Sequence, residues 1–470
     1  MSLLVSDPAL YLKRELDRKS RVLLINPPVE ERRYHWLRWN QPTELLRLST
    51  WLKRTHRGLD VKLFDFMFPD ENERVPKHKV KETWKGNETD DQLWHFGQPL
   101  AKFEDALRSF IASKWVPDLI VVSSLTSYWH ASIEKLLPRI CELLGKKRRQ
   151  SVTIGLYGNY PRLEPEHAQE QTDADVAFCK SVVADGLPPD FDLYKQEHGR
   201  LPHFFGLDVN DRAVGEHLEQ CLSLRVDAQR RLGVTRPASI TVAFFNEDLC
   251  SHNSNLEQVV SFAARRGKQF VAEGITGIEP RSLTRGRLEQ LKAANFRSLF
   301  VEHARLPGGA VDEQAYDSLL SFLANEAHHK KSGAAASSWI ERGNVTGFVG
   351  MGRQDDDIDA LVEATVKINS FFQAVILKPF GYSPTIDRAE APERRKRWPS
   401  PCASSPQWFP YVGNGSSLCR GDYDNLLRWQ NVLNKRVKGA TFDFLDDGNV
   451  ARMVRETLVG ESWKRQPEVR

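Results

Sequence analysis

The chain has 470 residues, of which 40% are hydrophobic and 27% charged, and its 66 basic and 62 acidic side chains leave a formal net charge of +4. This composition is typical of a soluble globular protein of two or three domains, and no apolar run approaches the roughly 20 residues that a membrane-spanning helix needs. Because the charge is nearly balanced and the basic runs GKKRRQ and ERRKRW are short, we expect neither a nucleic-acid nor a membrane partner.

Residues 1–20 mix apolar, acidic and basic side chains without a small-residue cleavage site, which predicts a surface helix and a cytoplasmic location. The first strongly apolar run is RVLLINPP, residues 21–28. Its unbroken Val-Leu-Leu-Ile is typical of a strand buried on both faces. Asn-Pro-Pro ends the strand, because proline donates no ladder hydrogen bond and restricts the residue before it. The loop that follows is expected to form a ligand wall at the sheet edge.

Strands and amphipathic helices alternate after this point. Helices are predicted for TELLRLSTWLKRTH, LAKFEDALRSFIASKW and ASIEKLLPRICELL, and strands for VKLFDFM, PDLIVVSSL and SVTIGLYGNYP. This alternation predicts a doubly wound, Rossmann-like α/β domain over residues 21–185. The proline-rich segment DGLPPDFDLYKQEHGRLP is interpreted as an irregular linker.

A second α/β series follows over residues 186–390. Strands are predicted for SITVAFFNEDL, KQFVAEGI, RSLFVEHA, VTGFVGMG and AVILKPF, and helices for the segments between them. Regular β-α units of this kind favour a partial (β/α) TIM-type barrel. Residues 391–470 are rich in proline, tryptophan and charge and are predicted to form a C-terminal extension with some helical patterning.

Several of these segments together resemble the cobalamin-binding radical SAM proteins. The likeness is carried by RVLLINPP, WHFGQPL, PDLIVVSSLTSYWHAS and VTIGLYGNYPRLEPEHA, and then by GITGIEPRSLTRGRLEQLKAANFRSLFVEHA and KPFGYSPTID. It spans residues 21–387 in order. The resemblance implies a cobalamin-binding domain followed by a radical-SAM-like barrel, with cobalamin as the cofactor and S-adenosylmethionine as a further candidate.

The resemblance also implies a corrinoid pocket at the strand ends of the first domain. Its candidate residues are Asn26, Pro27, Pro28, Ser123, Ser124, Thr126, Ser127, Gly155, Gly158 and Asn159. The hydroxyls suit amide arms or phosphate, and the glycines permit close backbone approach, yet the same residues equally suit helix capping and chain turns. The domain lacks Asp-x-His-x-x-Gly, so His130 and His167 are interpreted as surface or capping residues, and no metal ligands are predicted.

One departure from the family pattern concerns the cysteines. Radical SAM enzymes hold a four-iron cluster with three cysteines at C-x-x-x-C-x-x-C. This chain has Cys141, Cys179, Cys221, Cys250, Cys402 and Cys419, and no two lie within seven residues. GFVGMGRQDDD also stands where the family usually carries Gly-x-Pro-Gly-Glu. We therefore predict a degenerate member without the iron–sulfur cluster.

Two hypotheses about function remain open. The first is a binding or partner protein that holds a corrinoid and works beside an intact homologous enzyme subunit. The second is a corrinoid-dependent methyltransferase, or an atypical radical SAM enzyme with a non-standard cluster site. For the second, the catalytic candidates are Glu279, Glu302 and Asp248, which follow predicted strands where barrel enzymes collect catalytic groups. Phosphate-loop, dinucleotide, zincin and serine-hydrolase motifs are absent from the sequence.

Overall fold

A computed structural model describes residues 2–17, 19–32, 41–71, 74–80, 93–124, 130–182, 186–245, 249–250, 255–306, 309–331, 344–351, 356–372 and 374–379, with Asp422 and Leu426. Contacts divide the chain into two compact units. The first comprises Met1–Leu207, Glu216–Ile240 and Gly381–Trp408, and the second Asp208–Gly215, Thr241–Phe380 and Phe409–Arg470. Within the described ranges, every helix is too short or too polar to cross a membrane.

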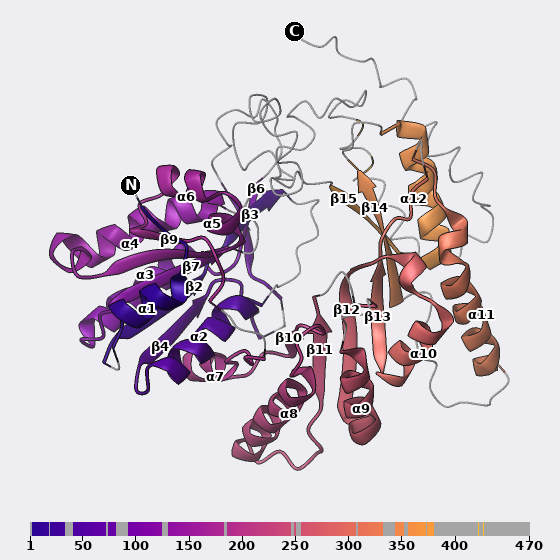
Figure 1. Cartoon of the computed structure of the whole chain (residues 1–470), viewed down its shortest axis with the longest axis horizontal. Coiled ribbons are helices and arrows are strands. Elements are labelled where there is room, and N and C mark those ends of the chain that lie inside the picture. Colours follow the sequence, from indigo (N-terminus) through magenta and orange to yellow (C-terminus); the bar gives the residue numbers. More distant parts are fainter. Residues whose placement is uncertain are drawn as a thin grey trace, which may run out of the picture. The chain divides into compact units, whose positions relative to one another are not determined.

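The first unit is built on a six-stranded sheet with the order β1-β9-β8-β7-β2-β4 (Figure 1). All neighbouring strands in it are parallel. Its strands are β1 (Leu3–Val5), β2 (Arg21–Asn26), β4 (Asp60–Asp65), β7 (Leu119–Ser124), β8 (Thr153–Gly158) and β9 (Val176–Phe178). The predicted α/β class with a parallel sheet is confirmed.

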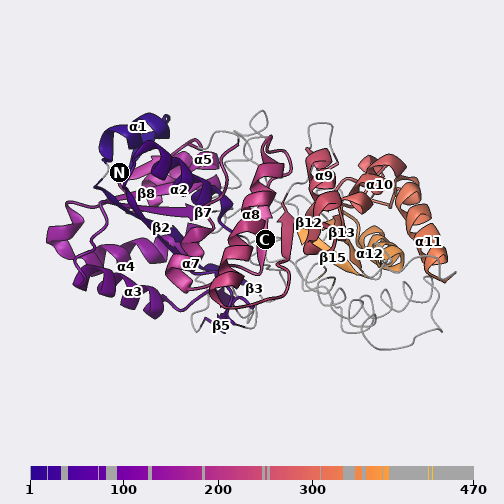
Figure 2. The same ribbon diagram turned by 90° about the horizontal axis from the view of Figure 1, so that it is seen from below.

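Helices cover both faces of this sheet. They are α1 (Pro8–Glu15), α2 (Thr43–Thr55), α3 (Leu100–Ala112), α4 (His130–Arg149), α5 (Asn159–Leu163) and α6 (Pro165–Gln171). Figure 2 shows α3 and α4 on one side of the sheet and α1 and α2 on the other. Leu23 and Ile25 of β2 belong to the apolar core that also contains Phe103 of α3 and Ile133 of α4. Because successive strand residues face opposite layers, a sheet covered twice needs an unbroken apolar run, as β2 has.

The amino-terminal segment and the loop after β2 contain strands that the sequence did not predict. The helix expected over residues 1–20 is limited to α1, and β1 precedes it at the sheet edge, parallel to β9. After Asn-Pro-Pro, the chain enters β3 (Val29–Arg32). This strand is antiparallel to β6 (Leu93–Phe96), which also pairs with β5 (Lys77–Lys79). These strands have three or four residues, which are too few to show the alternation of apolar and polar side chains that predicts a strand.

The segment interpreted as an irregular linker contains helix α7 (Asp192–His198). Tyr194 of this helix is fully buried, and α7 packs on β4. A helix of seven residues is too short to show a clear helical period, and the prolines that precede it concealed it further. The segment is therefore part of the core of the first unit.

The second half of the chain forms a sheet with the order β10-β11-β12-β13-β14-β15. Its strands are β10 (Phe204–Leu207), β11 (Ile240–Phe244), β12 (Phe270–Ile278), β13 (Phe296–Val301), β14 (Val345–Met351) and β15 (Val375–Pro379). The pairs from β12 to β15 are parallel. A sequential parallel order is the order found in segments of (β/α) barrels.

Helices again alternate with these strands. They are α8 (Val214–Arg231), α9 (Leu256–Arg266), α10 (Arg285–Ala293), α11 (Asp317–Lys331) and α12 (Ile358–Phe372), with short 3-10 helices η2 (Gly267–Gln269), η3 (Pro280–Ser282) and η4 (Glu313–Tyr316). Helix α9 packs on β12, α10 on β13, and α12 on β14 and β15. The predicted C-terminal extension, residues 391–470, lies outside the described residues except for Asp422 and Leu426.

Candidate functional site

The connections of the first sheet reverse direction between β2 and β7. From β2 the chain moves to β4 on one side, and from β4 it crosses back to β7, β8 and β9 on the other. With β1 set aside, this is the flavodoxin-like order 2-1-3-4-5, in which ligands bind outside the carboxyl ends of the first and third strands. Those strands end here at Asn26 and Ser124. The candidate site therefore lies at this edge of the sheet.

The side chain of Asn26 is hydrogen-bonded to the neighbouring strand. Its Nδ2 donates a hydrogen bond of 2.6 Å to Oδ1 of Asp65, its partner in register at the end of β4. The hydroxyl of Tyr194 donates to Oδ2 of the same buried carboxylate at 2.8 Å. Burial and the adjacent carboxylate raise the pKa of Tyr194 well above its ordinary value, so the hydroxyl remains a donor. Asn26 thus fixes the strand end, and the buried Pro27 and Pro28 lead the chain onward to β3.

Of the candidate serines, Ser123 lies in β7 near its carboxyl end. It comes directly after Val122, which is in register with Ile25 of β2, and it is buried at 5% exposure. The side chain of Ser124, together with Thr126 and Ser127, lies outside the described residues.

The two candidate glycines of β8 occupy different environments. A Cβ on Gly155 would lie 2.8 Å from Cε2 of Phe178 and 3.1 Å from Cγ2 of Val176, so this glycine makes room for side chains of β9. Gly158 ends the strand with φ 91° and ψ −157°, a conformation that essentially only glycine adopts. Asn159 begins α5, where its Oδ1 accepts a hydrogen bond from the guanidinium of Arg162. Gly158 and Asn159 therefore lie at the site edge, whereas Gly155 lies inside the sheet.

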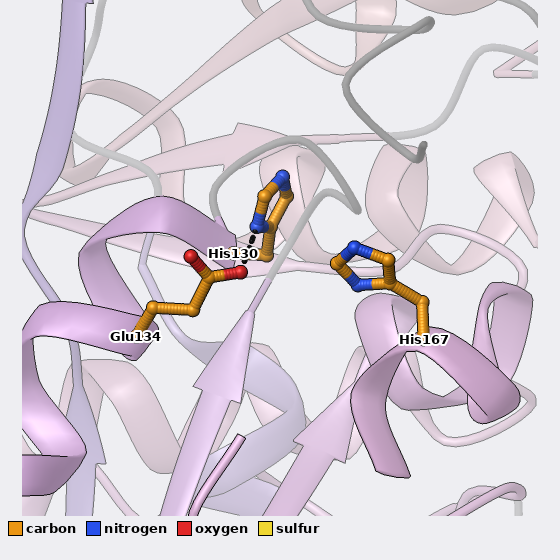
Figure 3. Close-up of side chains that lie close together, drawn as sticks. All are labelled: His130, Glu134 and His167. Atoms are coloured by element: carbon orange, nitrogen blue, oxygen red, sulfur yellow. Dashed lines mark hydrogen bonds and ion pairs between the residues drawn. The ribbon is translucent and has the colours of Figure 1, made fainter. Parts of the chain in front are cut away.

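His130, Glu134 and His167 come together beside the same strand ends (Figure 3). His130 begins α4 and is 4% exposed, and its Nδ1 lies 2.6 Å from Oε1 of Glu134. His167 comes from α6, with its ring centroid 5.0 Å from that of His130. The hydroxyl of Tyr160 lies 2.8 Å from Nδ1 of His167. The expected surface position of His130 was wrong, because the imidazole is buried and paired with a carboxylate.

The environment of His167 disfavours its protonated form. Burial, followed by the neighbouring His130, lowers the pKa of His167 to about 4. The His167 imidazole is therefore neutral near pH 7, which is the form that binds metal ions. One ligand atom from each of His130, Glu134 and His167 lies within 4.8 Å of the others.

In the second half of the chain, Glu279 and Glu302 follow two paired strands. Ile278 at the end of β12 is in register with Val301 at the end of β13, so the next residue of each strand is one of these glutamates. The candidate carboxylates therefore belong to neighbouring strand ends. Asp248, the third catalytic candidate, lies outside the described residues.

The two glutamates have different surroundings. Glu279 is exposed, and its Oε1 accepts a hydrogen bond of 3.0 Å from Arg281, which also pairs with Asp312 at 2.5 Å. Glu302 is half-buried and lies over Gly277, where an added Cβ would collide with its carboxylate. Gly277 thus gives Glu302 its place above the strand end.

The described cysteines are Cys141 and Cys179, which are half-buried, and Cys221 and Cys250, which are buried. Burial raises the pKa of Cys250 to about 12 and also raises that of Cys221. Both thiols are therefore protonated near neutral pH. Cys402 and Cys419 lie outside the described residues.

The sequence predictions missed the histidine cluster and the Asp65–Tyr194 contact. The available signal for the cluster was that His130 immediately precedes a predicted helix and Glu134 follows it by four residues. His167 and Tyr194 reach their partners through the tertiary fold, and no local pattern indicates either contact.

No protein-family model and no curated protein matches the chain. Among solved structures, it is similar to TsrM from Kitasatospora setae, a radical S-adenosylmethionine methyltransferase. With cobalamin and a 4Fe-4S cluster bound, that structure gives a TM-score of 0.46 at 12% identity, over 94% of this chain and 100% of that chain. With tryptophan substrate and a SAM analogue bound, the TM-score is 0.43 at 12% identity, over 79% of this chain and 77% of that chain. Similarities of this size assign neither a family nor a function.

Proposed function

We propose that the protein binds a corrinoid at the carboxyl edge of its first sheet and acts as a binding or partner protein without a radical SAM cluster. The observation that carries the proposal is the reversal point between β2 and β7, where Asn26 ends β2 before the two prolines and Ser123 is the penultimate residue of the neighbouring β7. The segments at this edge are also those in which the sequence resembles cobalamin-binding radical SAM proteins. An intact homologous enzyme is the partner that this role requires.

The residues at this edge suit a broad ring that carries amide arms. Strand β8 ends in Gly158, which has no side chain to cover the backbone, so a flat ligand can approach the strand end closely. Asn159 beside it offers an amide, and Ser123 offers a hydroxyl, as polar groups for orientation. A bound corrinoid would supply cobalt chemistry, while this chain would bind and orient it.

The cysteines support a role without the cluster. Iron–sulfur clusters are held by thiolates. Burial keeps the thiols of Cys221 and Cys250 protonated, which disfavours their use as ligands. The absence of C-x-x-x-C-x-x-C from the sequence points in the same direction.

A corrinoid-dependent methyltransferase is the second candidate. Glu279 and Glu302 follow neighbouring parallel strands of a sequentially ordered sheet, and we propose that this sheet is part of a (β/α) barrel. Catalytic groups of barrels collect at such strand ends. In this alternative, the two carboxylates would bind the methyl acceptor or receive a proton from it.

Titration of the purified protein with hydroxocobalamin, followed by visible absorption, tests the proposal. We expect saturable binding of one corrinoid per chain. Asn159→Trp places bulk at the carboxyl end of β8 and should weaken binding at least about tenfold, or ~1.4 kcal/mol. Ser151→Trp is the matched control, because exposed Ser151 precedes the amino end of the same strand. Its affinity should equal that of the wild type.

Absence of saturable binding, or equal weakening by both tryptophan variants, would overturn the proposed pocket. Iron measured after anaerobic reconstitution separates the two candidate functions. About four irons per chain would replace the binding-protein role with that of an atypical radical enzyme. Methyl transfer from methylcobalamin that is lost in Glu302→Gln would establish the methyltransferase.

A further inference from the structure

We propose that His130, Glu134 and His167 form a binding site for a divalent transition-metal ion of the zinc type. Two imidazoles and one carboxylate form a ligand set found in zinc sites that keep a fourth position open. The site is distinct from the cobalt of a corrinoid, because its ligands are all protein side chains. The inference therefore stands independently of the proposed corrinoid function.

The fold brings the three side chains together from two helices. His130 and Glu134 are one turn apart on α4 and share one face, whereas His167 projects from α6 toward them (Figure 3). Their ligand atoms lie within 4.8 Å of one another. Tetrahedral zinc with bonds of about 2.0–2.2 Å separates its ligands by roughly 3.4 Å. Side-chain movements on the order of 1 Å would therefore close the set around an ion.

Tyr160 selects the ring nitrogen of His167 that can face the ion. Its hydroxyl lies 2.8 Å from Nδ1, and the Tyr160 side chain is fully buried. In the metal-binding tautomer, Nδ1–H of His167 donates to the hydroxyl oxygen, and Nε2 presents its lone pair to the ion. Metal-bound histidines generally have such a partner on the other nitrogen, which fixes the orientation of the ring.

The exposure of the cluster suits exchange of an ion with solvent. His130 is buried at 4% exposure, while the Glu134 side chain is 35% exposed and His167 is half-buried. The buried imidazole forms the floor of the site, and the other two ligands leave a route from solvent. The 2.6 Å contact between His130 and Glu134 also gives each group a partner without metal, so the experiment must separate metal binding from a purely structural network.

The test is titration of metal-free, corrinoid-free full-length protein with Zn²⁺ by calorimetry and with Co²⁺ by visible absorption. One ion per chain is expected, with the intense d–d absorption of four- or five-coordinate Co²⁺. His167→Gln and Glu134→Gln should each weaken binding at least about thirtyfold, because each removes one ligand. Tyr160→Phe should weaken it about tenfold or more, the usual effect of losing a histidine's supporting partner.

His78→Gln is the control, because His78 is an exposed imidazole on β5. It should bind the ion as the wild type does. Far-ultraviolet circular dichroism identifies any variant that fails to fold. If His167→Gln does not fold, Glu134→Gln still tests the site, because Glu134 occupies a partly exposed position on α4 where substitution is generally tolerated. Less than one ion per chain, or equal affinity in the wild type and Glu134→Gln, would overturn the site. Failure to bind hydroxocobalamin would overturn only the corrinoid proposal.

Discussion

Asp65 is a buried carboxylate whose hydrogen-bond donors come from separate parts of the first unit. Asn26 donates from β2, the backbone N–H of Met67 donates locally at 2.9 Å, and Tyr194 donates from α7. A buried charge needs such donors to compensate for its lost hydration. At the scale of single residues, this carboxylate connects α7 to the strand edge that carries the candidate site.

Tyr194→Phe should destabilise the first unit by about 1.5–3 kcal/mol, because it removes a hydrogen bond to a buried charge while keeping the ring. Urea denaturation followed by circular dichroism measures the change. Tyr11→Phe is the matched control, since Tyr11 is partly exposed and its loss of a hydroxyl should cost less than about 0.5 kcal/mol. Equal effects of the two substitutions would show that the hydroxyl of Tyr194 does not support Asp65.

His198 should make the stability of the first unit dependent on pH. Its ring stacks on Phe68 with centroids 4.1 Å apart, and burial, followed by the charge of Arg200, lowers its pKa to about 4. Between this value and the ordinary 6.5, the unfolded chain binds a proton that the folded chain excludes. Stability is therefore lost as the pH falls through this window, by up to roughly 1.4 kcal/mol per pH unit.

The variant His198→Phe isolates this contribution, since it keeps a ring against Phe68 and removes the titrating nitrogen. Urea denaturation at several pH values between 4 and 7 should show a shallower decline for His198→Phe than for the wild type. His167 titrates in the same direction and leaves a residual slope in the variant. Parallel pH profiles for the two proteins would contradict the assignment to His198.

At the scale of the element, β8 is shaped by its contact with β9. Gly155→Ala would place a Cβ 2.8 Å from Phe178 and 3.1 Å from Val176. We expect a loss of about 1–3 kcal/mol in the free energy of unfolding, because a packed core resists added volume. Gly350→Ala in β14 is the control, since a Cβ there meets no atom within 4 Å. It should be neutral or stabilising. Similar losses from both, measured by thermal denaturation, would contradict the packing role of Gly155.

Elements with a clear apolar period were predictable from sequence. Strand β2 has an unbroken apolar run, and α2 repeats leucines at helical spacing, so local pattern and tertiary burial agree. Among the elements that escaped prediction, β1, β3, β5, β6 and α7 have only three to seven residues. Such short elements are determined by the neighbours that they pair with or pack against, which the local sequence does not reveal.

At the scale of the whole molecule, the sequence indicated where strands end but not which side chains meet there. Asn26 and Gly158 lie at strand ends and Ser123 lies next to one, and the parallel sheet brings these ends to one edge. The partners of these residues depend on the order of the strands across the sheet. The same holds for His130 and His167, because the connection through β8 determines that α4 and α6 adjoin.

The pairing of β1 with β9 has a consequence for how the chain is made. Leu3 lies in register with Val176, so β1 must wait during synthesis for a partner that lies 173 residues further along the chain. At about 5–20 residues per second, that interval lasts on the order of ten to thirty seconds. During this time β2, β4, β7 and β8 are already available to pair with one another, whereas the partner of β1 does not yet exist. Strand β1 is therefore translated before the other strands of its sheet and is among the last to join it.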